Sequence, residues 1–307
     1  MDDGLAIGVR FALYLTLATL FGLAALSLYG LRDGGRHDTL ALRPWLVTSS
    51  GLALMFSVAW LVLTAAGLAG TPVWPIDRAA VEALLAQSAG GTAWQVRMVA
   101  LAVAAAAAIR ASDRFGLASV ASCGALALAI LAWTGHGAMD DGAIGWFHFA
   151  ADIAHLLAAG VWVGALLGLI LLVSRPASRV DAAHLGAAHR ALHEFTTVGT
   201  IVVATLVATG VANIWLLVGI GNLTTLGATL YGQILFAKLA LFAAMLGLAA
   251  LNRFRLTPAF ESSIAAADHR AALAALRFSL VIEMTAVITI LALVAWLGTL
   301  APPGSGA

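Results

Sequence analysis

Eight apolar runs of roughly 20 residues constrain the fold of this chain more than any other feature of its sequence. They lie at about 9–31, 45–68, 92–110, 116–134, 144–173, 195–219, 229–251 and 277–300. A run of this length crosses a bilayer as an α-helix, which satisfies its own backbone polar groups in lipid. Hydrophobic residues make up 62% of the 307, and charged residues 10%, whereas a soluble domain carries about 25% charge. The sequence therefore predicts an all-α polytopic membrane protein, with about eight transmembrane helices in one domain over residues 1–307.

The arginines predict the orientation of these helices. Twelve of the sixteen basic residues follow the first, third, fifth or seventh run: Arg32, Arg36, Arg43, Arg110, Arg114, Arg175, Arg179, Arg190, Arg253, Arg255, Arg270 and Arg277. Basic loops stay on the cytoplasmic side of a membrane. We therefore expect both termini to lie outside, which is the periplasm if the membrane is the inner membrane of a bacterium.

Two connecting segments are long enough to have features of their own. The outer segment at 69–91 contains TPVWP, whose Pro72 and Pro75 are expected to end the preceding helix, and then a short amphipathic helix. The inner segment at 174–194 is polar and reads as a solvated loop. It contains three histidines whose role the sequence leaves open: His184, His189 and His193.

The fifth apolar run carries an unusual set of ionisable residues. His148, Asp152 and His155 are spaced by four and three residues, so they project within roughly 60° of one helix face. His136 and Met139 precede them in a Gly-rich turn. Imidazole and carboxylate ligands suit Cu(II), Zn(II) or Ni(II), and a chain with one cysteine builds no thiolate cage. The alternative is a structural role, in which these side chains hydrogen-bond to neighbouring helices.

Other polar residues fall within the spans at depths that helix geometry gives. Lys238 lies about 13 Å from the outer end of its span, level with Asp152, so these two charges are a candidate pair that would compete with a metal. Glu283 lies nearer the inner face, and Asn213 near the outer one. Trp162 is two turns beyond His155 on the same face and is expected to line a pocket floor. Ranked by depth, these residues would form a partial path across the membrane.

Three stretches resemble the copper resistance protein D (CopD/PcoD) family. The run TGHGAMDDGAIGWFHFAADIAHLLAAGVWVGALLGL is similar to its GHA…H…D..H…WVG signature. The stretches LYGQILFAKLALFAAMLGLAALNRFRLTP and LRFSLVIEMTAVITILALVAWLGTLAPP resemble its later segments. HEFTTVG at 193–199 departs from an RFS-like stretch that the family commonly has there. The first three helices match only in general character.

The resemblance implies a multi-pass inner-membrane protein that moves copper inward. It implies metal roles for His136, His148 and His155, with Asp152 in the same motif, and it gives Lys238 and Glu283 no role. The expected cargo is copper, and His and Asp ligands favour Cu(II). The expected partners are the lipid bilayer and a separate periplasmic copper-binding protein of the CopC type, with no nucleic acid.

Two other functions remain open at this stage. One is a b-type haem electron-transfer protein, although axial histidines usually come from two facing helices and here they share one. The other is a copper-binding assembly or accessory subunit without transport. No nucleotide-binding loop is present, so we expect no ATP-driven step and no enzymatic activity.

Overall fold

The structure is a computed structural model that describes residues 3–31, 41–110, 113–134, 142–175, 182–219, 221, 224–265 and 270–301. Every secondary-structure element in the described part is a helix. The elements are α1 (Asp3–Tyr29), α3 (Leu42–Ala69), α4 (Arg78–Gln87), α5 (Ala89–Ile109), α6 (Arg114–Ala129), η1 (Ile130–Thr134), α7 (Gly142–Val173), α8 (Ala182–Val218), η5 (Leu226–Ala228), α9 (Leu230–Leu251), η6 (Asn252–Leu256), α10 (Thr257–Ala265) and α11 (Arg270–Leu297).

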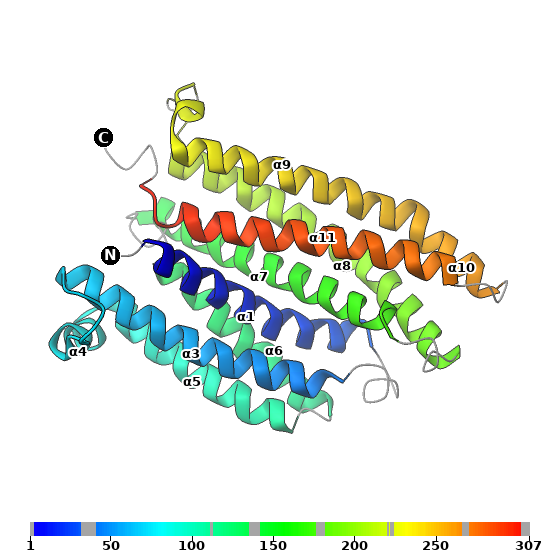
Figure 1. Cartoon of the computed structure of the whole chain (residues 1–307), viewed down its shortest axis with the longest axis horizontal. Helices are drawn as coiled ribbons and strands as arrows, with labels where there is room; N and C mark the ends of the chain where they lie inside the picture. Colours follow the sequence, from blue (N-terminus) through cyan, green and yellow to red (C-terminus); the bar gives the residue numbers. More distant parts are fainter. Residues whose placement is uncertain are drawn as a thin grey trace.

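The helices form one elongated bundle with α1 and α7 at its centre. Figure 1 shows α3 and α5 on one side of this central pair, and α9 and α11 on the other. α1 begins and α11 ends at the same end of the bundle, which also carries α4, and α10 lies at the opposite end. We call these the α4 end and the α10 end. Among the described residues, eight helices are long and apolar enough to cross a membrane, which confirms the predicted number of spans.

Glycines explain why the two central helices lie so close together. A side chain at Gly22 of α1 would collide with the backbone of Gly160, and one at Gly164 of α7 would collide with the backbone of Gly22. Gly160, Gly164 and Gly168 are spaced by four residues, so they form one face of α7. Small residues at this spacing let helix backbones approach in a membrane, where packing rather than the hydrophobic effect drives association.

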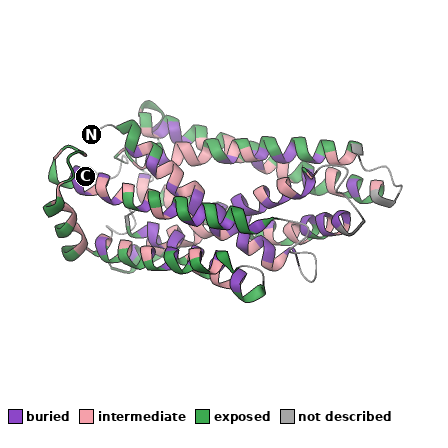
Figure 2. Cartoon of the chain, turned by 60° about the horizontal axis from the view of Figure 1, so that its bottom comes forward, coloured by how far each residue is buried: buried purple, intermediate pink, exposed green. Residues whose placement is uncertain are grey.

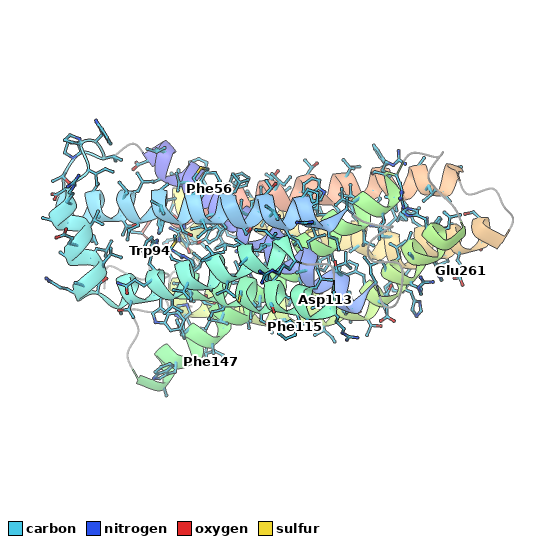
Figure 3. All side chains as sticks on the ribbon, turned by 90° about the horizontal axis from the view of Figure 1, so that it is seen from below. Phe56, Trp94, Asp113, Phe115, Phe147 and Glu261 are labelled. Atoms are coloured by element: carbon cyan, nitrogen blue, oxygen red, sulfur yellow. The ribbon has the colours of Figure 1, made fainter. Side chains whose placement is uncertain are left out.

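The burial pattern fits a bundle surrounded by lipid. Figure 2 shows buried residues along the central helices and exposed ones on the outward faces. Many exposed side chains are large and apolar, and among them Phe115 and Phe147 point away from the bundle in Figure 3. Apolar surface of this extent marks a membrane contact in a chain with eight candidate spans.

One local prediction is refined and another is wrong, each for a physical reason. α3 ends at Ala69 because Gly70 caps it in a left-handed conformation (φ 66°), before either proline is reached. The segment 174–194 is not a loop throughout, since α8 begins at Ala182. Its sequence AAHLGAAHRALHEF is rich in strong helix formers, and one face of it packs on the core.

Candidate functional site

A cavity of about 500 Å³ lies inside the bundle, between the α7–α8 pair and the α9–α11 pair. α1 and η1 close one side of it through residues such as Tyr14 and Leu131. Most of its wall is apolar. The sequence-predicted residues that line it are Asp152, His155, Trp162, Asn213 and Lys238.

Asp152 is held in place by a neighbouring helix. The Asn213 side-chain amide on α8 donates a hydrogen bond of 2.7 Å to Oδ1 of Asp152. The other oxygen, Oδ2, is 4.0 Å from Nε2 of His148, one turn earlier on α7. His148 is 1% exposed and Asp152 remains partly accessible, so the carboxylate is the member of this pair that faces the cavity.

The contacts of His155 determine which of its nitrogens is available. Nδ1 lies 2.8 Å from the hydroxyl of Thr209 on α8. That hydroxyl donates its proton to the carbonyl oxygen of Thr205 at 2.6 Å, and a carbonyl cannot donate in return. Thr209 must therefore accept from Nδ1–H of His155. In the neutral imidazole this leaves the lone pair on Nε2, which is the atom that a metal or a proton would use.

Two cationic side chains share the cavity with these groups. Lys238 on α9, the sole lysine of the chain, interacts electrostatically with both Asp152 and His155. Arg10 on α1 is fixed near the α4 end, where it donates to the Gly298 carbonyl at 2.7 Å and to the Tyr14 hydroxyl at 3.0 Å. The predicted Asp152–Lys238 proximity is therefore present, and the cavity carries charges of both signs.

The floor of the cavity is aromatic and lies toward the α10 end. Trp162 is 3% exposed and packs edge-on against Phe195, with ring centroids 5.7 Å apart. Met245 is buried in the core and also lines the cavity. Glu283 does not line the cavity and lies beyond this floor, where Asn252 donates to it at 2.9 Å.

The other predicted metal ligands do not line this cavity in the described part of the chain. His136 and Met139 lie outside the described residues, so their predicted ligand roles stay predictions. Within the described ranges, no three His, Cys, Asp or Glu side chains converge as metal ligands. His155 is the only histidine among the described cavity-lining residues, so the cavity offers no axial histidine pair for a haem.

The three inner histidines have separate environments. His184 was expected in a solvated loop, yet its side chain is buried, with 2% exposed. Its Nε2–H donates to the Leu172 carbonyl at 2.9 Å, and its Nδ1 lies 3.0 Å from Nη1 of Arg175. It therefore satisfies a carbonyl at the C-terminal end of α7. His189 is half-buried beside Glu261, and His193 is exposed.

Several residues of the site were missed by the sequence reasoning. Thr209 gave no signal, because a threonine within a span usually bonds to its own helix. Arg10 gives no signal in the sequence beyond its charge near the start of the first apolar run. Met245 was indistinguishable from other methionines along the spans, because its contact with the cavity depends on how α9 is rotated against α7.

Comparison with known sequences places two regions of the chain. Residues 1–146 match the family model described as "Copper resistance protein D-like, N-terminal domain", and residues 189–297 match the one described as "Copper resistance protein D". Most of α7, including Asp152 and His155, lies between the two matched regions. No solved structure matches the chain.

Three curated proteins show the extent of the similarity. Copper resistance protein D of Pseudomonas syringae pv. tomato is 41% identical over 307 residues, which cover 98% of both chains. Copper transport protein CutJ of Bacillus subtilis (strain 168) is 28% identical over 255 residues, 79% of this chain and 45% of that protein. Inner membrane protein YebZ of Escherichia coli (strain K12) is 30% identical over 129 residues, 42% of each.

Proposed function

Because this chain belongs to the copper resistance protein D family, we propose that it is a copper permease, which takes copper from the periplasm toward the cytoplasm. It is a multi-pass protein of the inner membrane and handles copper, in keeping with the copper resistance and copper transport relatives. The finer proposal is that copper passes through the cavity, where Asp152 and His155 are its ligands. A separate periplasmic copper-binding chain of the CopC type is the proposed donor.

The observation that carries this proposal is the orientation of the two ligands by α8. Asn213 fixes the Asp152 carboxylate, and Thr209 fixes the tautomer of His155 so that Nε2 is available. Residues that orient ligands in this way are typical of metal sites. A purely structural role would use the same two hydrogen bonds, so the metal role rests on their combination with a cavity that both Asp152 and His155 line.

The incomplete ligand set supports transit rather than storage. A closed cage of three or four protein ligands would hold copper too tightly to release it, whereas conduction requires binding that is weak enough to leave. Two cavity-facing ligands leave positions for water on the ion. Lys238 would also compete with copper for Asp152, which weakens binding further and returns a positive charge to the carboxylate after the ion leaves.

The decisive experiment is copper uptake into proteoliposomes that contain the Asp152→Asn variant. Asparagine still accepts the hydrogen bond from Asn213, so the fold is retained while the anionic ligand is lost. We expect uptake and copper affinity to fall by ~10-fold or more. The matched control is Asp77→Asn, because Asp77 caps α4 outside the cavity and asparagine caps helices equally well. Equal uptake by wild type and Asp152→Asn would reject the site.

A second candidate is a copper-binding accessory subunit that does not transport. The floor favours it, since Trp162, which packs against Phe195, lines the cavity toward the α10 end. The same proteoliposomes distinguish the two. Copper that binds to the protein in an Asp152-dependent manner, without accumulating in the vesicle lumen, would identify the accessory role.

A further inference from the structure

A second polar group is buried on the far side of the cavity floor, and the proposed passage of copper gives it no role. It consists of Trp162, Asn252, Ser279 and Glu283, each less than 9% exposed. The Asn252 amide donates to Oε2 of Glu283 at 2.9 Å. The Trp162 indole interacts with the Glu283 carboxyl, whereas Oδ1 of Asn252 and Oγ of Ser279 have no hydrogen-bond partner within the part of the chain that the structure describes.

The backbone is built to bring Asn252 to this position. Asn252 is the first residue of η6, a π-helical turn between α9 and α10. A π turn is rare, and it rotates the following residues relative to a regular helix, often at functional sites. Here it places Asn252 against Glu283 of α11, and Ser279 precedes Glu283 by one turn on the same face.

This group lies directly beyond the end of the cavity. Val287 of α11 lines the cavity, and Glu283 is one turn, or about 6 Å, further toward the α10 end. Trp162 lines the cavity and its indole also lies close to the Glu283 carboxyl. A cation that leaves the cavity past Trp162 therefore meets the Glu283 carboxyl next.

No positive charge balances this carboxyl. Its neighbours are Asn252 and Trp162, and in the described part of the chain no cation pairs with it. The titratable or charged groups on the elements packed against it, and on α11 itself, are Asp3, Arg10, Tyr14, Tyr29, His148, Asp152, His155, Tyr231, Lys238, Arg253, Arg255, Glu261, Arg270 and Arg277. Arg10, Arg253 and Arg277 are bonded elsewhere, to Gly298, Thr200 and Val173. An ionised carboxylate buried without a counter-ion costs several kcal/mol, and protonation removes that cost.

From this geometry we propose that Glu283 is a proton-binding site that exchanges its proton for the copper ion as the ion leaves the cavity past Trp162. The exchange of the proton for copper rests on the proposed copper permease function. The presence of the proton on Glu283 does not. When copper is absent, the Glu283 carboxyl is neutral and its O–H can donate to Ser279 or Asn252. When copper arrives, the O–H bond breaks, its electron pair forms the Cu–O bond, and the proton passes to water at the α10 end. No oxidation or reduction takes place.

The test is infrared spectroscopy of the purified full-length protein in nanodiscs, with CuCl₂ added to the sample. A protonated carboxylic acid gives a C=O stretching band well separated from carboxylate bands. We expect such a band in the wild type and in the control Glu261→Gln, which removes an exposed carboxyl at the same end of the bundle. The band should be absent in Glu283→Gln. Copper should abolish it and release one proton per bound ion.

Asn252→Ala provides a second way to assign the infrared band to Glu283. It does not require that the Glu283→Gln variant folds. Loss of the hydrogen bond from Asn252 should shift the frequency of the same band. If no band responds to either substitution, Glu283 holds no proton and the proposal is overturned.

The remaining outcomes separate this proposal from the proposed function. If copper binds in an Asp152-dependent manner but leaves the band unchanged, the exchange is rejected while the permease stands. If copper does not bind at all, the permease fails and the exchange fails with it. The band then still decides whether Glu283 holds a proton.

Discussion

At the scale of single residues, the site depends on α8 as much as on the ligands of α7. His155 can present Nε2 only because Thr209 accepts its Nδ1–H, and Thr209 can accept only because its own proton goes to Thr205. This chain of two hydrogen bonds selects one tautomer and one ring orientation. The metal-binding capacity of His155 is therefore set by a residue that never touches the metal.

Thr209→Val should weaken copper binding without unfolding the protein. Valine has nearly the same shape but cannot accept from Nδ1–H, so the ring loses its fixed tautomer. We expect the affinity for Cu(II), measured by titration of the purified protein, to fall by ~10–100-fold. Thr209→Ser should retain the affinity because it keeps the hydroxyl. The matched control is Thr205→Val, a half-buried threonine one turn away on the same helix. Unchanged affinity in Thr209→Val would show that His155 is not a ligand through Nε2.

Residue identities at the site were predictable only where charge made them conspicuous. Asp152, His155 and Lys238 stand out as ionisable groups within apolar runs, and helix geometry placed them at similar depths. The burial of His184 was not predictable, because a histidine in a polar stretch reads as solvated until the register of α8 on α7 is known. The ligand roles of His136 and Met139 stay predictions.

At the scale of elements, the glycine face of α7 sets the distance between the two central helices. Gly22 of α1 meets Gly160 and Gly164, and no side chain fits between them. The same helix carries Asp152 and His155 a few turns away. The close packing of α1 and α7 therefore fixes the position of the site helix relative to the rest of the bundle.

Gly164→Ala should separate α1 from α7 and destabilise the protein. Overpacking of a well-packed contact costs about 1–3 kcal/mol, and here the obstruction is backbone that has little freedom to shift. We expect a lower midpoint in a thermal unfolding assay in detergent. The control is Gly51→Ala in α3, where an added methyl group meets nothing within 4 Å. That variant should be neutral or slightly stabilised, because alanine favours helix over glycine. Equal stability of the two variants would mean that the α1–α7 contact is not rigid.

The number of spans was predictable because a 20-residue apolar run has few other solutions, whereas helix ends were not. α3 stops at a left-handed Gly70, and the helix that begins with α9 continues through the π turn η6 into α10. Neither event changes hydropathy. Both depend on local backbone geometry, which the composition of a run does not record.

At the scale of the whole molecule, the bundle is asymmetric along its long axis. The cavity extends from Arg10 and Gly298 near the α4 end down to Trp162, and Glu283 is buried beyond it. Twelve of the sixteen basic residues belong to segments that the sequence assigns to the opposite side from the termini. If the α4 end faces the periplasm, the open part of the cavity faces the supply of copper. The direction of transport thus depends on which end of the bundle faces the periplasm.

Fusion reporters should place the α4 end in the periplasm. Basic loops are retained in the cytoplasm, and α1 begins and α11 ends at the same end of the bundle, as an even number of spans requires. Alkaline phosphatase is active only in the periplasm, so its fusion to the C-terminus should be active. Green fluorescent protein fused to the C-terminus would be exported in the same way and should be dark. The matched control is a fusion of each reporter after Ala265, at the end of α10, where the pattern should reverse. Fluorescence at the C-terminus with phosphatase activity after Ala265 would invert the bundle. The cavity would then open to the cytoplasm, and the same geometry would describe export of copper rather than uptake.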